Sequence, residues 1–264
     1  MAAVPQSENQ TDYLPRVDWV DGVVRKGRSP REGYVRGWGL QFGTLREQVR
    51  ADPVYRDAIA LAEGRSVMAE DNRLNLFLLL RFYVPRLPFG HVAEFGAYRG
   101  GNAMFMARVL QHTLPAARVY AFDTFAGMPR TDTGVDAHRP GDFADVDIAE
   151  LRASAAAHGL HNLEFVQGLF EDTAPAFLAH KGPIALAHID SDIYTGVASA
   201  YHAVKPRMVP RGYYVFDDAT VASCLGATEA VEELLVRRDR LHSEQIYPQF
   251  VFRADPDPPD TDRS

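Results

Sequence analysis

The sequence predicts an α/β fold in which helices cover both faces of a mainly parallel, doubly wound sheet. Two observations carry this prediction. After Pro88, short apolar runs alternate with segments in which apolar residues recur at helical spacing, and such an alternation is typical of βαβ units. The composition, 46% hydrophobic and 24% charged, is that of a globular protein with a packed core.

The N-terminal region differs from the rest in composition. The chain has 264 residues, which fits one large domain with extensions because domains contain about 150 residues. Residues 1–40 are rich in Gly, Arg and Pro and are expected to form an arm. This arm is either a solvated extension, or it folds over a site or a partner subunit through Tyr34, Trp38 and Phe42.

The remaining chain divides into three parts. Residues 41–88 are predicted to form a helical segment, because apolar residues recur every three or four positions from Leu45 to Val84. Residues 89–254 are predicted to form the main domain. Residues 255–264 have no apolar face and are expected to be a disordered tail.

The elements of the main domain follow one another in alternation. Strands are predicted at 91–96, 117–123, 163–168, 184–190, 212–218 and 246–253. Helices are predicted at 102–112, 148–159, 174–182, 198–208 and 227–238. The segment 124–146 matches neither pattern, and loops of this length are usually lids, binding loops or disordered.

Charge and hydropathy exclude several classes of partner. The 28 Lys and Arg residues are outnumbered by 35 Asp and Glu residues, giving a net charge of −7, so nucleic acid is not an expected partner. The most apolar stretch, residues 74–84, contains Asn75 and Arg81 and is shorter than the roughly 20 residues that cross a bilayer, so no membrane partner is expected. With one cysteine and no leader pattern, a cytoplasmic protein is expected.

The first predicted strand ends in a glycine-rich turn, Glu94-Phe-Gly-Ala-Tyr-Arg-Gly-Gly. Such a turn brings a ligand close to the backbone and to a helix N-terminus. A dinucleotide fingerprint needs a glycine where Tyr98 lies, and no phosphate-loop lysine follows, so a diphosphate ligand is disfavoured. The alternative is a turn used for packing alone.

Acidic residues end three further strands. Asp123, at the end of the second strand, is placed to accept hydrogen bonds from a ribose, although a turn or helix-cap role is the alternative. Asp190 and Asp192 follow the fourth strand, and Asp217 and Asp218 end the fifth. If these two strands are neighbours, the four carboxylates repel one another unless they are neutralised by a cation.

The ligand types favour a hard cation. Carboxylates select Mg²⁺, with Ca²⁺ or Mn²⁺ possible, and zinc is disfavoured because no His or Cys cluster is expected beside them. The alternative is that two carboxylates cap helices and two are solvated. If the strand continues past Asp190, the spacing of two residues puts Asp192 on the same side of the strand as Asp190.

The histidines and the cysteine are expected to have structural positions. His158, His161 and His180 are expected at the surface, His188 along a strand, and Cys224 as a small buried residue.

Several segments together resemble the S-adenosylmethionine-dependent O-methyltransferases of the macrocin type, which modify deoxysugars on antibiotics. The matching segments are RSVMAEDNRL, EFGAYRGG, FDTFAGMP, GLFEDT, HIDSDIY and FDDA. The resemblance implies a class I methyltransferase fold with seven strands, the last antiparallel, at 89–254. It also implies that the helices of 41–88 contribute to the acceptor pocket. The arm and the C-terminal strand match weakly.

The resemblance also implies roles for the residues at the strand ends. Mg²⁺ is expected at Asp190, Asp217 and Asp218, and Asp192 matches the position of the general base. The predicted contacts of S-adenosylmethionine are Ser66, Glu94, Gly96, Tyr98, Arg99, Gly100, Asp123, Thr124, Gln167, Gly168 and Asp190.

We therefore expect an S-adenosylmethionine- and Mg²⁺-dependent O-methyltransferase acting on a sugar hydroxyl of a glycosylated secondary metabolite. Its partner is a small-molecule glycoside, and a homo-oligomer of two or more chains is expected. A catechol- or phenol-type, metal-dependent O-methyltransferase is the alternative enzyme. A non-catalytic nucleotide-binding module has no need of four aspartates. An oxidoreductase would use a Tyr-Lys pair such as Tyr201 and Lys205, but the glycine fingerprint is absent.

Overall fold

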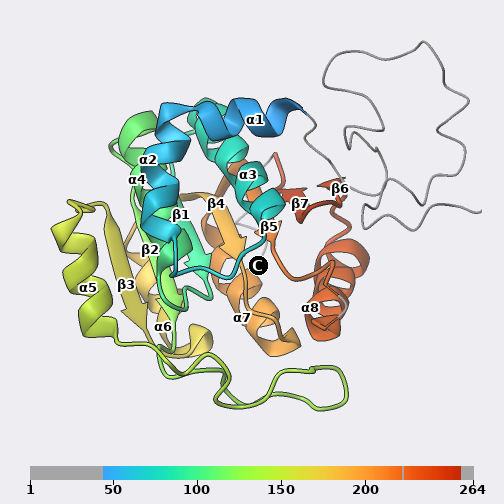
Figure 1. Ribbon diagram of the computed structural model, residues 1–264. Helices are drawn as coiled ribbons and strands as arrows, with labels where there is room; N and C mark the ends of the chain where they lie inside the picture. The colour runs from blue at the N-terminus through green and yellow to red at the C-terminus, as the bar shows by residue number, and fades with distance from the viewer. Residues whose placement is uncertain (1–43, 222, 257–264) are drawn as a thin grey trace, which may run out of the picture.

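A computed structural model describes residues 44–221 and 223–256 (Figure 1). Within these residues, seven strands form one mixed sheet between two layers of helices, so the predicted α/β fold is confirmed. No helix in this part of the chain is long and apolar enough to span a membrane. The predicted arm at 1–40 and residues 257–264 of the predicted tail lie outside the described residues.

The elements alternate along the main domain as expected. The strands are β1 His91–Phe95, β2 Val119–Asp123, β3 Leu163–Gln167, β4 Ile184–Ile189, β5 Met208–Phe216, β6 Ser243–Gln245 and β7 Phe250–Arg253. The α-helices are α1 Thr44–Ala51, α2 Pro53–Ala62, α3 Glu70–Leu78, α4 Gly101–Thr113, α5 Ile148–Ala157, α6 Phe170–Ala179, α7 Tyr194–Val204 and α8 Leu225–Ala230. Short π- and 3₁₀-helical turns follow α3, α7 and α8, at Leu79–Tyr83, Val84–Arg86, Lys205–Arg207 and Val231–Arg238.

The strand order is β3-β2-β1-β4-β5-β7-β6. The first five strands in this order are parallel, and β7 runs antiparallel to β5. The chain moves outward from β1 to β3 and then returns to β4 on the other side of β1, so the direction of winding reverses there. Ligands of open α/β sheets bind outside the carboxyl ends of the strands at such a switch point.

The N-terminal helices form part of one face of the molecule. Asp52 caps α2 by accepting a hydrogen bond of 2.8 Å from the Val54 amide. The ring of Tyr55 meets Phe77 of α3 and Phe105 of α4 edge-on, at centroid distances of 5.2 and 5.8 Å. These aromatic contacts fix the helices of 44–86 on α4 and hold the segment before β1 against the sheet.

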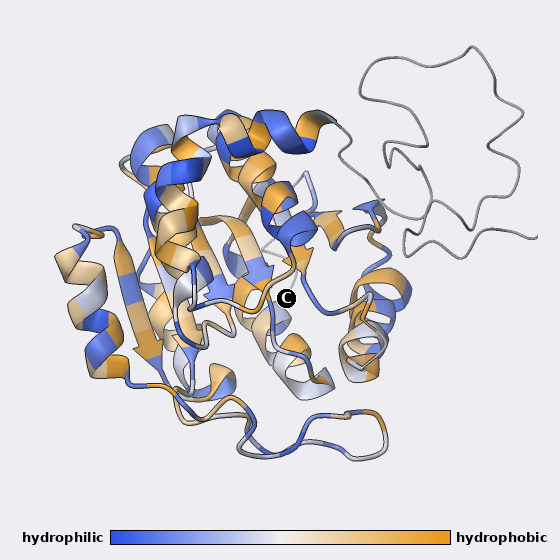
Figure 2. Ribbon diagram, in the orientation of Figure 1, coloured by the Kyte–Doolittle hydropathy of each residue, from blue (hydrophilic) through white to orange (hydrophobic). Residues whose placement is uncertain are grey.

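Two hydrophobic layers enclose the sheet. Alternate strand residues point to opposite faces, so Val92 packs with α2, α3 and α4, whereas Ala93 and Phe95 pack with α6 and α7. Figure 2 shows mainly orange strands, while the helices carry both orange and blue residues. The strand ends are therefore held by a rigid core on both sides.

The C-terminal strands differ from the prediction. A single strand is predicted at 246–253, but the structure contains β6 at Ser243–Gln245 and β7 at Phe250–Arg253. Pro248 lies between them, and proline cannot donate to a strand ladder. The turn has a functional consequence, because it places the fully buried Gln249 beside the end of β5.

The segment 124–146 packs across the carboxyl edge of the sheet, at the bottom of Figure 1. Asp136 is buried and accepts a hydrogen bond of 3.1 Å from the Tyr194 amide, at the start of α7. The carbonyl of Val135 accepts one of 3.1 Å from Gly226 of α8. Among the predicted alternatives, these contacts favour a lid or binding loop.

Candidate active site

The glycine turn after β1 lies at the switch point of the sheet. Gly96 has a φ of +95°, and a Cβ atom built on it would lie 1.6 Å from the carbonyl oxygen of Asp190. Its amide donates to the Phe122 carbonyl at 2.9 Å. Only glycine fits this position, because a side chain would collide with the chain leaving β4.

Asp123 ties two turns together at the end of β2. Its Oδ2 accepts a hydrogen bond of 2.8 Å from the Tyr98 amide, and its Oδ1 accepts one of 2.7 Å from the Phe125 amide. Both donors have left-handed backbones, with φ of 46° and 51°. Burial raises the pKa of Asp123 despite these bonds. Its Oδ1 also accepts a bond of 3.4 Å from the Thr124 hydroxyl. A carboxylate has about four acceptor positions, so Asp123 keeps about one for a ligand.

Glu94 lies behind the pocket wall and is fully buried. Its Oε1 accepts a hydrogen bond of 2.6 Å from Asn102 and lies 3.5 Å from Nδ1 of His188. Its Oε2 has no hydrogen-bond partner among the described residues. A buried carboxylate oxygen without a donor is costly, so Oε2 of Glu94 lacks one stabilising hydrogen bond within the described residues.

His188 links Glu94 to the acidic edge. Its Nε2 lies 3.6 Å from Oδ1 of Asp217. Burial lowers the pKa of His188, but its two carboxylate partners outweigh this effect and raise the pKa to about 9. The two carboxylates therefore favour the imidazolium form of His188. The prediction placed His188 along a strand but missed its contacts with Glu94 and Asp217. Its position two residues before Asp190 was the one sequence feature that could have indicated them.

Three carboxylates gather at the ends of β4 and β5. Oxygen atoms of Asp190, Asp217 and Asp218 all lie within 4.8 Å of one another. Burial, followed by the neighbouring carboxylates, raises the pKa of Asp190 well above its ordinary value and that of Asp218 to about 8. Burial is the larger cause of both shifts, and the mutual repulsion of carboxylates that share a buried site adds to it.

Asp217 is the most strongly hydrogen-bonded of the three. Its Oδ1 accepts a bond of 3.0 Å from Asn72 of α3 and a further bond from Gln249. Burial opposes its ionisation, but the nearby His188 and the bonds from Gln249 and Asn72 outweigh burial and lower the pKa of Asp217. Asp217 therefore stays ionised and provides a fixed negative charge at this edge.

Asp192 reaches this edge in an unexpected way. β4 ends at Ile189, and Asp192 has a left-handed φ of 60°. The argument from continued strand alternation is therefore wrong. A turn directs the side chain instead, and the Asp192 amide donates a bond of 3.0 Å to Oδ2 of Asp218. Burial raises the pKa of Asp192, and the nearby His138 acts against it.

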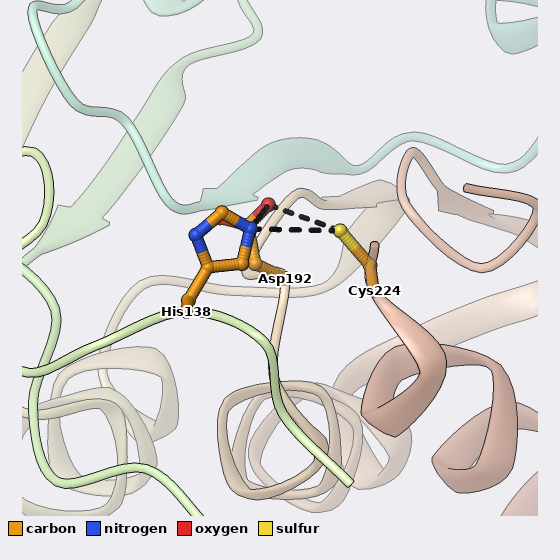
Figure 3. A group of neighbouring side chains, drawn as sticks. All are labelled: His138, Asp192 and Cys224. Atoms are coloured by element: carbon orange, nitrogen blue, oxygen red, sulfur yellow. Dashed lines mark hydrogen bonds and ion pairs between the residues drawn. The ribbon is translucent and has the colours of Figure 1, made fainter. Parts of the chain in front are cut away.

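The helix-cap alternative for Asp192 is not supported by the structure. The amide at the start of α7 is bonded by Asp136 of the loop, and α7 has no side-chain cap from Asp192. Asp192 instead contacts His138 and Cys224 (Figure 3). The expectation that no His or Cys lies beside the carboxylates is therefore wrong, because the loop 124–146 and the start of α8 fold over the same edge.

One pocket of about 540 Å³ connects these groups. The segment before α3 contributes Val67, Met68 and Ala69, and the loop contributes Met128, Arg130 and other residues. The predicted site residues that line it are Gly96, Tyr98, Asp123, Thr124, Asp190, Asp192, Asp217 and Asp218.

The other predicted cofactor contacts do not line this pocket. Ser66 accepts a hydrogen bond of 2.9 Å from Arg73, and Arg99 pairs with Asp145. The remaining four predicted contacts are the buried Glu94, the N-cap of α4 at Gly100, the exposed Gln167, and Gly168 after β3.

Several minor predictions have clear outcomes. His158, His161 and His180 are exposed and Cys224 is buried, as expected. Tyr201 and Lys205 both bond Asp239 and do not line the pocket. Asn72, His138 and Gln249 were missed, because single polar residues in a loop or a helix carry no pattern that marks them.

Comparisons with known proteins agree with this geometry. A family model described as macrocin O-methyltransferase (TylF) matches residues 81–240. A tetracenomycin-C rhamnosyl 4'-O-methyltransferase of Streptomyces olivaceus is 32% identical over 148 residues, which are 52% of this chain and 56% of that protein. The mycinamicin III 3''-O-methyltransferase of Micromonospora griseorubida is 27% identical over 57% of this chain and 61% of its own length. The chain thus spans less than two thirds of these relatives.

Two solved structures share the fold. The O-methyltransferase NovP superposes with a TM-score of 0.58 at 23% identity, over 80% of this chain and 95% of NovP. The calicheamicin methyltransferase CalS11 superposes with a TM-score of 0.57 at 23% identity, over 76% of this chain and 91% of CalS11. The fold is that of class I methyltransferases.

Proposed function

Because this chain belongs to the macrocin O-methyltransferase family, we propose that it transfers a methyl group from S-adenosylmethionine to a sugar hydroxyl of a glycosylated antibiotic or related metabolite. We propose in addition that the reaction depends on Mg²⁺. The observation that carries both proposals is that one pocket joins the glycine turn and Asp123 to the carboxylates at the ends of β4 and β5.

The residues around the glycine turn and Asp123 suit S-adenosylmethionine. Gly96 lines the pocket, and Asp123 has an acceptor position left for a ribose hydroxyl. Glu94 does not line the pocket, but its Oε2 is buried without a partner among the described residues, and we propose that it takes a donor such as an ammonium group. The other predicted contacts, including Ser66 and Gln167, stay predictions.

The carboxylates at the ends of β4 and β5 suit Mg²⁺. Asp190, Asp217 and Asp218 offer oxygen atoms within 4.8 Å of one another, and hard cations prefer such ligands. When bound, the ion supplies Lewis acidity that makes an acceptor hydroxyl easier to deprotonate. Asn72 and Gln249 hold Asp217 in place through hydrogen bonds, as is typical of groups around metal ligands.

Asp192 is our proposed general base. It lines the same pocket and is tied to Asp218 through its own amide. Its partial burial raises its pKa, which brings a carboxylate closer to the range useful for accepting a proton. In this role Asp192 takes the proton of the sugar hydroxyl while the methyl group is transferred in line.

The acceptor is proposed to be a deoxysugar with two neighbouring hydroxyls on a larger apolar scaffold. Two such hydroxyls suit one divalent ion. The apolar residues Val67, Met68 and Met128 line the pocket next to the loop 124–146 and suit a bulky aglycone. A catechol satisfies the same metal chemistry and is the alternative acceptor. We also propose a homo-oligomer, which sedimentation equilibrium tests.

The decisive experiment is an intact-mass assay of rhamnosylated antibiotics and of free catechol, each incubated with S-adenosylmethionine. Each reaction is run with Mg²⁺ and after exhaustive chelation. We expect a gain of one methyl group on a glycoside only when Mg²⁺ is present. Faster methylation of catechol than of every glycoside would favour the alternative acceptor, and full activity after chelation would remove the metal from the proposal.

A further inference from the structure

We propose that His138, Asp192 and Cys224 form a second metal site that takes Zn²⁺ or a similar borderline-soft divalent ion. Figure 3 shows the three side chains pointing toward one another from the loop 124–146, the turn after β4 and the start of α8. This set combines a nitrogen, an oxygen and a sulfur atom. It differs in chemistry from the three carboxylates proposed to hold Mg²⁺.

The spacing of the ligand atoms matches a tetrahedral site. Nε2 of His138 lies 3.4 Å from Oδ1 of Asp192, Sγ of Cys224 lies 3.4 Å from the same oxygen, and Sγ lies 3.8 Å from Nε2. With zinc bonds of about 2.3 Å to sulfur and about 2.0 Å to nitrogen and oxygen, the edges of a tetrahedron are about 3.3 to 3.6 Å. The three atoms therefore form one face of such a tetrahedron with shifts of a few tenths of an ångström.

The surroundings of His138 support metal binding. Its second ring nitrogen, Nδ1, lies 3.5 Å from Oδ2 of Asp142. Histidines that bind metals commonly donate their other N–H group to a carboxylate, which sets the tautomer and the ring orientation. Asp142 thus leaves Nε2 of His138 free to face Asp192 and Cys224.

The environment of Cys224 opposes the thiolate until a cation is present. The side chain is 2% exposed, and burial together with Asp218 and Asp192 raises the pKa of the thiol to about 12. The thiol is therefore protonated and unreactive without a metal. Coordination breaks the S–H bond, leaves the electron pair on sulfur for the metal and releases the proton to water.

Occupation of this site has a consequence that rests on the proposed function of Asp192 as the base. A metal on Oδ1 of Asp192 uses a lone pair that otherwise accepts the proton. It also links the loop 124–146 to the start of α8. Zn²⁺ is thus expected to inhibit methyl transfer even when Mg²⁺ is saturating.

The site is tested by titrating Co²⁺, a spectroscopic substitute for Zn²⁺, into the full-length protein saturated with Mg²⁺, without S-adenosylmethionine or glycoside. Cys224 is the one cysteine in the sequence, so a cobalt–thiolate charge-transfer band in the near ultraviolet reports on this site alone. We expect one Co²⁺ per chain, displaced by Zn²⁺. Cys224→Ser and His138→Ala should lose the band or bind at least about tenfold more weakly.

Three matched variants sharpen the result. Asp142→Asn, at a partly exposed side chain, should weaken binding by about 10- to 100-fold without removing a ligand. His161→Ala removes an exposed histidine and should leave the band unchanged. Asp217→Asn alters the carboxylate cluster and should also keep the band, since that cluster contains no sulfur.

The outcomes separate this site from the proposed function. Absence of the band in the wild-type protein, or equal affinity in the wild type and His138→Ala, would overturn the site. A band without methyl transfer to any acceptor would support the metal site and reject the enzyme proposal. Methyl transfer without a band would support the enzyme proposal and reject the metal site.

Discussion

The backbone amide of Asp192 donates a hydrogen bond of 3.0 Å to Oδ2 of Asp218. This bond joins the turn after β4 to the end of β5, two strands that are neighbours in the sheet. It holds Asp192 in a left-handed conformation, which Asp and Asn adopt more readily than most residues. The position of the proposed base thus depends on a partner 26 residues away in the chain.

Asp192→Asn tests the role of Asp192 in catalysis. Asn keeps the shape and tolerates the same backbone conformation, but it cannot accept the proton. We expect turnover to fall by about 10² to 10⁴, the range for loss of a positioned base, while calorimetry shows unchanged affinity for S-adenosylmethionine. Turnover close to wild type from about pH 6 to about pH 9 would assign the base to another group.

Gly96→Ala tests the close approach of β1 to the chain after β4. The new Cβ atom meets the carbonyl oxygen of Asp190 in a backbone conformation unfavourable for alanine. We expect a loss of about 2 to 6 kcal/mol in the free energy of unfolding, from strain and overpacking together. Gly159→Ala is the control, because its φ is +69° with no atom within 4 Å, and it should cost about 1 to 2 kcal/mol. Equal losses in denaturant titrations would contradict this explanation.

Asp123→Asn tests cofactor binding at the end of β2. The amide group of Asn replaces one acceptor with a donor, which opposes the amides of Tyr98 and Phe125 and any ribose hydroxyl. We expect binding of S-adenosylhomocysteine to weaken by about 1 to 3 kcal/mol in calorimetry. Asp172→Asn, an exposed position in the first turn of α6, is the control. Unchanged affinity in Asp123→Asn would remove this residue from the cofactor site.

The metal-free protein should lose stability as the pH rises. Folding raises the pKa of Asp218 from 3.8 to about 8 and that of His188 from 6.5 to about 9. For each group, between its unfolded and its folded pKa, the folded state binds more protons than the unfolded state. The free energy of unfolding therefore falls with increasing pH. We expect the Tm in EDTA to decrease from about pH 6 to about pH 9.

Addition of Mg²⁺ provides the complementary measurement. At about pH 8 the carboxylates must ionise against one another unless a cation is bound, so Mg²⁺ should raise the Tm more there than at about pH 6. Asp217→Asn should reduce this increase. A Tm in EDTA that rises with pH, or an Mg²⁺ effect independent of pH, would contradict the proposed metal site.

The alternation of strands and helices was predictable from the sequence, because local hydrophobic periodicity reports which face of each element is buried. The parallel arrangement followed from this alternation. It made the carboxyl ends of the strands the place to search, where Gly96, Asp123 and Asp190 now line one pocket. β6 was missed because Ser243–Gln245 is a short polar segment just before the predicted strand at 246–253, and within that predicted strand only the part after Pro248 forms β7.

The sequence by itself determined the α/β class, the glycine turn and the set of acidic strand ends, because each depends on neighbours within a few residues. The pairing of His188 with both Glu94 and Asp217, and the meeting of His138, Asp192 and Cys224, were decided only by tertiary structure. The paired residues lie 29 to 94 positions apart in the chain. They are brought together by strand order and by a loop without periodicity. Local patterns carry no information about such contacts, because packing between distant elements sets them.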